Sequence, residues 1–308
     1  MNDTQRKVME FWRQEFTAGG FPGTGGLRLQ YARHAANGRT ALVVVSGRTE
    51  FMEKYAEIFH DLREVGVGFY IYDHRGQGNS GRLLVDPQKG HIDEFTNYVK
   101  DLAIFLEYVV RPDRPRKIIL LSHSMGGAIS LLLARNHPAL LDGLVLSSPM
   151  CSINTRPFPR LLARSFARAA ILAGMEADYV FGTGPWKRDM PFENNILTGS
   201  RCRFDWNLRL VGEKPALAIG GPTFGWLDQS FQALDVLLRK QGPKTLPVLL
   251  LQGEDDRVVG YREQLEIYHG LGGSRRRSFP RARHELLMED DLIRSAALQE
   301  IAAFLADF

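Results

Sequence analysis

The sequence has few cysteines and no long apolar run, and both shortages narrow the kind of protein it encodes. Cys151 and Cys202 are its two cysteines among 308 residues. Neither stands in a metal-binding or redox spacing, so we expect free thiols in a reducing compartment. No apolar stretch approaches the roughly 20 residues that a membrane-spanning helix needs. No histidine, cysteine or carboxylate spacing typical of a metal site occurs either, so we expect neither a metal nor another cofactor.

Charge of one sign is not in large excess. The formal net charge is +4 at pH 7, well short of the basic excess typical of nucleic-acid-binding proteins, so no nucleic-acid partner is expected. The first residues lack the apolar core of a signal peptide, and Glu10 and Glu15 argue against one. We therefore expect a cytoplasmic protein, with peripheral association at the inner membrane surface left open.

Apolar strands alternate with amphipathic helices along most of the chain. Strands are predicted at residues 27–34, 41–45, 67–72, 117–122, 143–147, 247–252 and 276–279. Helices are predicted at 4–16, 51–65, 91–110, after 124, and at 159–173, 226–240, 261–271 and 291–308. This order implies right-handed crossovers, and therefore an α/β fold with a mostly parallel sheet between two layers of helices.

Two local expectations concern the N-terminal part. The glycine-rich residues 19–26 are predicted to form a turn or loop. Residues 27–34 alternate as an exposed edge strand should.

The alternation breaks between residues 150 and 225. This stretch holds no clear strand, several prolines and glycines, and one basic amphipathic helix. An insertion at this place would cover the carboxyl ends of the parallel strands, where such sheets keep their sites. We therefore divide the chain into an N-terminal core part (1–149), a helical cap or lid (150–225) and a C-terminal core part (226–308).

A sharp turn at Ser124 is the strongest functional signal. The apolar residues 118–121 stop at Ser122-His123-Ser124, and small residues then lead into a helix. This strand–turn–helix context is that of a nucleophile elbow, usually written G-x-S-x-G, here with Ser122 in place of the first glycine. The hydroxyl at such an apex is exposed, and the helix N-terminus stabilises negative charge.

A serine nucleophile needs a histidine base and an orienting carboxylate, which follow it in the order acid, then histidine, in this kind of fold. His284 directly follows the last predicted strand, whereas His269 lies near a helix end where a cation caps the helix. We therefore predict His284 as the base. Glu254, Asp255 and Asp256 compete for the role of acid, and spacing alone does not separate them.

Two backbone N–H groups are expected to bind the oxyanion of the tetrahedral intermediate. One belongs to Met125, and the other is predicted at Arg48, in the loop after the strand 41–45. We expect the Arg48 side chain either to reach a substrate anion or to form a surface ion pair with Glu50. His123 adjoins the nucleophile, but we expect its side chain to point elsewhere.

Residues 76–81 match the G-x-G-x-x-G fingerprint of dinucleotide-binding proteins. That fingerprint requires a helix that opens at once, and the following residues, which include Pro87, break any such helix. We therefore interpret these glycines as turn residues.

The chain resembles, over almost its whole length, the α/β-hydrolases of the monoacylglycerol lipase and bacterial lysophospholipase (L-two type) family. The matching segments are residues 73–78, 80–84, 122–130 and 249–252, and in the lid 182–184, 195–198 and 220–223. The resemblance implies Asp256 as the acid and agrees on Ser124 and His284. It also places Ser46 where many relatives have a histidine.

The resemblance implies a serine carboxylester hydrolase that releases a fatty acid from a lysophospholipid through an acyl-enzyme. A monoacylglycerol lipase, or a hydrolase of another small ester or thioester, is the alternative, and transfer of the acyl group to a second lipid is not excluded. A non-enzymatic lipid-binding role is disfavoured because all three triad positions are filled. The oligomeric state is not readable from the sequence.

The lid is expected to supply an apolar acyl tunnel and a basic stripe. The candidate lining residues are Leu161, Leu162, Phe166, Ile171, Leu172, Phe181 and Trp186. Arg156, Arg160, Arg164 and Arg168 recur every four residues. This stripe is interpreted either as a solvated face or as a site for phosphate headgroups.

Overall fold

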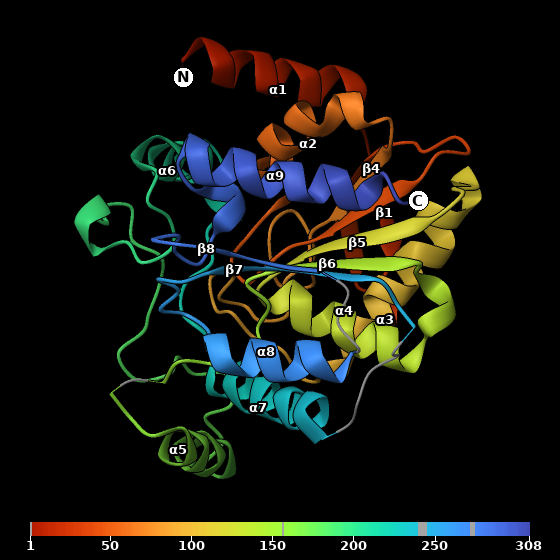
Figure 1. The fold of residues 1–308 in the computed structure, drawn as a ribbon. Helices are drawn as coiled ribbons and strands as arrows, with labels where there is room; N and C mark the ends of the chain where they lie inside the picture. Colours follow the sequence, from red (N-terminus) through yellow and green to blue (C-terminus); the bar gives the residue numbers. More distant parts are fainter. Residues whose placement is uncertain (1, 156, 240–244, 272–274) are drawn as a thin grey trace.

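An eight-stranded sheet forms the centre of the computed structural model (Figure 1). The structure describes residues 2–155, 157–239, 245–271 and 275–308. The strands are β1 (Thr17–Pro22), β2 (Arg28–His34), β3 (Ala41–Val45), β4 (Gly68–Tyr72), β5 (Ile118–His123), β6 (Gly143–Ser147), β7 (Val248–Gly253) and β8 (Arg275–Phe279). They lie in the order β1-β2-β4-β3-β5-β6-β7-β8. The β1–β2 and β2–β4 pairs are antiparallel and the other five are parallel, which confirms the predicted mostly parallel sheet.

Helices cover both faces of this sheet (Figure 1). One face carries α1 (Asp3–Glu15), α2 (Ala56–Leu62) and α9 (Asp291–Leu305), and the other carries α3 (Thr96–Phe105), α4 (Met125–Asn136), α7 (Phe224–Arg239) and α8 (Tyr261–Gly270). Strands β3, β5, β6 and β7 are buried along their whole length, because a continuous apolar run is stable only with both of its faces covered. None of the helices in the described ranges has the length and hydropathy needed to span a bilayer.

The prediction of a loop at residues 19–26 is wrong for its first half, which belongs to β1. Gly19 pairs with Tyr31 of β2 in antiparallel register, and a Cβ at Gly19 would lie within 3.0 Å of the Tyr31 ring. The glycine therefore lets a neighbouring ring lie over the strand. Because β1 is outermost, β2 is not the edge strand that its alternation indicated.

Two helices, α5 (Arg160–Leu172) and α6 (Arg201–Glu213), lie between β6 and α7. Helix α5 agrees with the prediction, but α6 was not predicted. It begins after Ser200, whose side chain accepts a hydrogen bond from the Arg203 amide, and it buries Trp206 and Val211. A serine cap before an apolar face was therefore a usable signal. No strand is assigned to the described residues between β6 and β7.

Predicted helix ends moved in several places. Helix α3 begins only at Thr96, and α2 is flanked by short 3-10 turns within residues 52–65. Helix α7 begins at Phe224, and Lys240, the last residue of the predicted helix, lies outside the described residues.

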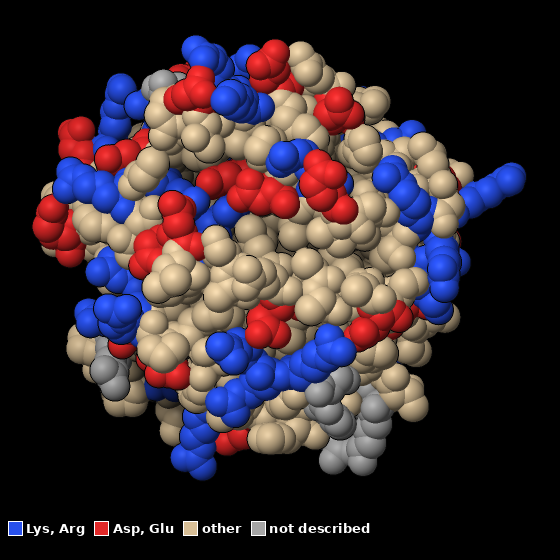
Figure 2. Space-filling model, turned by 45° about the horizontal axis from the view of Figure 1, so that its top comes forward, with Lys and Arg blue, Asp and Glu red and all other residues tan. Residues whose placement is uncertain are grey.

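On the face shown in Figure 2, basic and acidic side chains are intermingled.

Gly126 allows α4 to begin directly against β3. A Cβ at Gly126 would lie within 3.0 Å of the Val45 carbonyl group, which is backbone and cannot move aside as a flexible side chain can. We expect Gly126→Ala to lower the free energy of unfolding by about 3 kcal/mol, measured by urea denaturation.

Gly270→Ala is the matched control, because nothing lies within 4 Å of its Cβ position. We expect this variant to unfold at the same urea concentration as the wild type or slightly above it. A Gly126→Ala protein as stable as Gly270→Ala would contradict the proposed close packing.

Candidate active site

Ser124 lies in the turn between β5 and α4 with a strained backbone. Its φ is 49° and its ψ is −117°, a conformation that non-glycine residues rarely adopt and that is typical of functional sites. Gly127 lets the helix pass close to Pro149, because a Cβ there would lie within 3.0 Å of the proline. The Ser122 hydroxyl donates a hydrogen bond to Ser130 Oγ at 2.7 Å. Serine at the first glycine position of the motif is therefore accommodated between strand and helix.

Ser124, His284 and Asp256 form a continuous hydrogen-bonded chain. His284 Nε2 lies 2.9 Å from Ser124 Oγ, and His284 Nδ1 lies 2.8 Å from Asp256 Oδ2. The second oxygen of Asp256 accepts hydrogen bonds from the Val258 and Val259 amides at 2.8 and 3.2 Å. This geometry can activate a serine for attack on a carbonyl, because the base is oriented by an acid held in place on its far side.

The structure also separates the candidates that spacing left open. Glu254 and Asp255 are exposed, whereas Asp256 is half-buried and turns toward His284. His269 is exposed near the end of α8. His284 is therefore the imidazole that contacts Ser124, and Asp256 is the carboxylate that contacts His284.

Two backbone amides near Ser124 are without a hydrogen-bond partner in the described chain. Gly47 adjoins the nucleophile, since a Cβ on it would lie 3.3 Å from Ser124 Cβ. The amides of Arg48 and of Met125, the first residue of α4, form no hydrogen bond with other groups of the described chain. The first N–H groups of a helix lack partners inside the helix and carry its partial positive charge. Both amides are therefore available to a developing oxyanion.

The loop that carries Gly47 is held by Gln77. Its side-chain nitrogen donates to the Gly47 carbonyl at 2.9 Å, and its side-chain oxygen accepts from the Thr49 amide at 3.1 Å. Gly76 and Gly78 have φ values of 78° and 52°, so the chain turns here and no helix opens. The residues that match G-x-G-x-x-G are thus part of a turn that supports the loop of Gly47 and Arg48 (the oxyanion loop).

A buried ion-pair network lies behind the histidine. Lys54 Nζ lies 2.8 Å from a Glu50 carboxylate oxygen and 2.7 Å from one of Glu285. Glu50 also accepts hydrogen bonds from the Tyr55 hydroxyl at 2.6 Å and from the Gly47 amide. Burial raises the pKa of Glu50, but the Lys54 ammonium, His123 and the Tyr55 hydroxyl together outweigh it and lower this pKa to about 2. The network joins the oxyanion loop to the loop that carries His284.

Two expectations about side chains near this network are wrong. Arg48 does not pair with Glu50, because Lys54 occupies that carboxylate. His123 does not point away from the site, because its ring centroid lies 4.9 Å from that of His284. Strand β5 continues through residue 123, and Ser122 faces α4, so alternation turns His123 to the opposite side.

Three potential metal ligands meet in the same place. Glu50, His123 and Glu285 offer ligand atoms that lie within 4.8 Å of one another. The Lys54 ammonium already bridges the two carboxylates, so the cation in this cluster is part of the chain. Burial lowers the pKa of His123.

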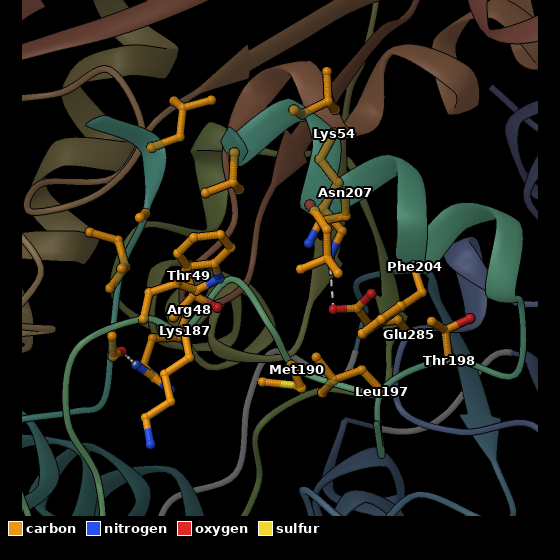
Figure 3. A pocket seen from close by; sticks show the side chains of 18 of the residues that line it. Arg48, Thr49, Lys54, Lys187, Met190, Leu197, Thr198, Phe204, Asn207 and Glu285 are labelled. Atoms are coloured by element: carbon orange, nitrogen blue, oxygen red, sulfur yellow. Dashed lines mark hydrogen bonds and ion pairs between the residues drawn. The ribbon is translucent and has the colours of Figure 1, made fainter. Parts of the chain in front are cut away.

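A cavity of about 380 Å³ lies beside Glu285, between the oxyanion loop, α6 and the segments 183–190 and 217–221 (Figure 3). Its apolar lining residues are Trp186, Met190, Leu197, Phe204, Trp206, Leu208, Leu210, Val211, Leu217, Ile219 and Met288. Its charged lining residues are Arg48, Lys54, Glu57, Lys187, Arg203 and Glu285. A cavity of this size and character is typical of a small-molecule site.

Of the residues predicted to line an acyl tunnel, Trp186 alone is among those lining this cavity. The side chains of Leu161, Leu162, Phe166, Leu172 and Phe181 are between 49% and 91% exposed, so the prediction is wrong for them. Ile171 is half-buried but does not line the cavity.

The orientation of α5 explains this error. Its inward face consists of Ala163, Ala167 and Ala170, which pack against Phe224, Leu227 and Phe231 near and in α7. Small residues bring the two helices close together. The large apolar residues of α5 therefore face outward.

The basic stripe of α5 also faces α7. Arg160 and Arg164 pair with Asp235 at 3.6 and 2.5 Å, and Arg168 pairs with Asp228 at 3.7 Å. Arg160 and Arg164 therefore serve helix packing, whereas the Arg168 side chain is 58% exposed and remains solvated, as one of the two interpretations expected. Arg156 lies outside the described residues.

Comparison with known proteins places the chain among ester hydrolases. Residues 36–291 match the family described as serine aminopeptidase, S33. Lysophospholipase L2 of Escherichia coli (strain K12) is 40% identical over 310 residues, which covers 98% of this chain and 90% of that protein. The monoglyceride lipase of Mus musculus is 27% identical over 81% of this chain and 80% of its own length.

Solved structures agree on the fold. A soluble variant of monoglyceride lipase from Saccharomyces cerevisiae superposes with a TM-score of 0.72 at 18% identity, covering 95% of this chain and 96% of that one. A carboxyl esterase from Bacillus coagulans gives 0.73 at 18% identity, covering 96% and 99%. The chain therefore has the α/β-hydrolase fold.

The Lys54 network predicts a pH-dependent loss of stability in Lys54→Met. Removal of the ammonium leaves two buried carboxylates without a counter-ion, so we expect the free energy of unfolding to fall by about 3–5 kcal/mol at neutral pH. In the wild type the pKa of Glu50 is depressed from 4.5 to about 2, so its contribution is complete above pH 4.5 and is lost as the pH falls toward 2. The difference between the two proteins should therefore shrink over this interval.

Urea denaturation at several pH values measures this difference. Lys100→Met is the control, because Lys100 Nζ lies 3.9 Å from the Glu94 carboxylate and both side chains are exposed. We expect it to change stability by less than about 1 kcal/mol. A Lys54→Met protein with the stability of Lys100→Met would refute the role of the network.

Proposed function

The chain belongs to the serine aminopeptidase S33 family of α/β-hydrolases, and we propose that it is a lysophospholipase that releases the fatty acid from a single-chain phospholipid. The observation that carries the proposal is the Asp256–His284–Ser124 hydrogen-bonded chain. A largely apolar cavity is lined by Glu285, which follows His284 in the chain, and by Arg48 of the oxyanion loop. The sequence similarity to a protein named lysophospholipase L2 over nearly the whole chain supports the substrate class.

The geometry assigns a role to each group in the first half of the reaction. Ser124 Oγ attacks the acyl carbonyl carbon while His284 Nε2 takes the serine proton. The carbonyl oxygen becomes an oxyanion and accepts hydrogen bonds from the Arg48 and Met125 amides. Asp256 holds the imidazole and stabilises its positive charge. The tetrahedral intermediate then breaks its bond to the glycerol oxygen, which receives the proton from His284.

Water completes the cycle. His284 takes a proton from a water molecule, whose oxygen attacks the acyl-enzyme carbonyl and forms a second tetrahedral intermediate at the same amides. The bond to Ser124 Oγ breaks, and the serine regains its proton from His284. The products are a free fatty acid and a glycerophosphodiester.

The apolar side of the cavity suits an acyl chain. Phe204, Leu210, Val211 and Met288 line it, and each methylene group transferred there from water contributes about 0.8 kcal/mol. The monoacylglycerol lipase alternative uses the same triad and the same apolar lining. The headgroup therefore discriminates between the two functions.

Hydrolysis of four lipids with one acyl chain tests the proposal. We expect a higher kcat/KM for lysophosphatidylethanolamine, lysophosphatidylcholine and lysophosphatidylglycerol than for monoacylglycerol. Ser124→Ala should remove the activity, and Asp256→Asn should lower kcat by about 10⁴-fold because the imidazole loses its orienting charge. Fatty-acid release followed by mass spectrometry measures each rate and detects diacylated products of acyl transfer.

Covalent labelling is the control for the nucleophile. A fluorophosphonate should modify Ser124 in the wild type and leave Ser124→Ala unlabelled. Activity that survives in Ser124→Ala would refute the nucleophile, and a preference for monoacylglycerol over all three lysophospholipids would refute the substrate.

We further propose that the outward face of α5 contacts the membrane surface, which supplies the lipid. Leu161 and Leu172 are 79% and 91% exposed, and Phe166 is 52% exposed. Helix α5 lies at the periphery of the molecule, with α7 between it and the sheet (Figure 1). An amphipathic helix with an apolar outer face binds the interface between water and acyl chains. The cytoplasmic location stays a prediction.

Vesicle flotation tests this contact. The double variant Leu161→Ser/Leu172→Ser should bind less to phosphatidylglycerol–phosphatidylethanolamine vesicles, with a partition coefficient at least about tenfold lower. The reason is that the favourable transfer of two leucine side chains from water into the membrane is lost. Leu292→Ser is the control, since Leu292 is 77% exposed on α9, on the other side of the sheet. Equal binding of both variants would refute α5 as the contact.

A further inference from the structure

Arg48 brings a cation from the oxyanion loop into the cavity that Glu285 also lines. Its backbone follows Gly47, which adjoins Ser124, and its half-buried side chain extends into the cavity lining. Figure 3 shows Arg48 on the same side of the cavity as Lys187, with Glu285 and Phe204 on the other side. The cavity therefore has a basic side close to the oxyanion loop.

The cations of this cavity differ in whether the chain neutralises them. Lys54 pairs with Glu50 and Glu285. Arg203 pairs with Glu57 at 2.8 Å and with Asp291 at 2.7 Å. Arg48 and Lys187, by contrast, form no ion pair with any described residue.

The guanidinium of Arg48 is nevertheless held in place. Its Nη1 donates to the Gly220 carbonyl at 2.9 Å, and its Cζ lies 5.5 Å from the centroid of the Trp226 ring. Its Nε and Nη2 form no hydrogen bond within the described chain. Most of the five N–H donors of this arginine are thus free for a ligand.

A cation withdrawn from water without a counter-ion is unfavourable. Burial lowers the pKa of Arg48 to about 10, so the side chain remains charged at neutral pH. The chain supplies carboxylates to Lys54 and Arg203, whereas it supplies a carbonyl and an aromatic ring to Arg48. The missing counter-ion indicates an anionic ligand.

We propose that Arg48 binds the phosphodiester of the lysophospholipid headgroup while the ester lies at Ser124, and that it thereby selects lysophospholipids over neutral monoacylglycerols. This inference rests on the proposed function and adds the residue that recognises the headgroup. A guanidinium matches two phosphate oxygens with two parallel N–H bonds. Lys187 adds a second positive charge on the same side.

The length of the Arg48 side chain and the length of the glycerol part of the substrate agree with this placement. The arginine side chain, from its α-carbon to its guanidinium, is about as long as the chain of atoms from the ester carbonyl through glycerol to the phosphorus. An ester carbonyl at the Arg48 amide therefore brings the phosphate to the level of the Arg48 guanidinium. One residue then contacts both ends of the polar part of the substrate.

The test is the ratio of kcat/KM for lysophosphatidylethanolamine to kcat/KM for monoacylglycerol of the same acyl chain. Arg48→Met keeps the backbone amide and removes the charge, and we expect the ratio to fall by about 10- to 100-fold. Arg48→Lys keeps a charge without the planar fork and should give an intermediate ratio. Arg209→Met removes a cation from α6 outside the cavity lining and should leave the ratio unchanged.

The outcomes separate this inference from the proposed function. A wild type that hydrolyses neither lipid refutes the function. A wild type that prefers the lysophospholipid, together with an Arg48→Met ratio equal to that of the wild type, refutes the headgroup contact alone. An equal loss on both substrates in Arg48→Met and Arg48→Lys assigns Arg48 to loop structure and also refutes it.

Inorganic phosphate distinguishes a lipid headgroup from a free anion. Added phosphate should compete with lysophosphatidylethanolamine in the wild type and should compete less in Arg48→Met. An alternative outcome is that phosphate changes the rate of monoacylglycerol hydrolysis in the wild type but not in Arg48→Met, while the two proteins have the same ratio of kcat/KM values. Arg48 would then bind a free anion and not the lipid headgroup, which would overturn the proposal.

Discussion

The strained turn at Ser124 is the constraint on which the site depends. A backbone with φ of 49° at a serine is unfavourable and persists only where the surrounding structure holds it. Here β5 leads directly into α4, whose Gly126 lies against the Val45 carbonyl. The same turn places the buried Ser124 hydroxyl at hydrogen-bond distance from His284 Nε2, leaves the Met125 amide without a partner in the described chain and lies next to Gly47. The packing of α4 against β3 therefore positions the nucleophile and the Met125 amide, while Gln77 holds the loop that carries the Arg48 amide.

Charge placement distinguishes the supporting groups from the groups that face the substrate. Lys54 is enclosed by Glu50 and Glu285 and ties the oxyanion loop to the histidine loop. Arg48 lies in the same cavity lining, but its partners are a carbonyl and an aromatic ring. A paired cation stabilises the site, whereas an unpaired one is available to an anionic substrate.

Elements buried on both faces were predictable, and elements that depend on a neighbour were not. Strand β3 matches its predicted bounds, because five consecutive apolar residues have few other stable environments. Strand β1 was missed, because Gly19 and Gly20 carry no strand signal and Gly19 instead makes room for the Tyr31 ring. The outward face of α5 was assigned to a tunnel, because amphipathicity does not tell which face meets the core when alanines pack inward.

The sequence by itself determined the α/β order, the elbow at Ser124 and the base His284, because these depend on local pattern and chain order. Spacing left three acids open, and the tertiary structure shows that Asp256 is the one whose carboxylate reaches the histidine. The tertiary structure alone decided that His123 adjoins His284 and that Arg48 has no carboxylate partner among the residues that the structure describes. The position of His123 depends on how far β5 continues, and the pairing of Arg48 depends on Lys54, which lies between Glu50 and the distant Glu285. Sequence pattern alone does not decide which of two nearby cations occupies a buried carboxylate.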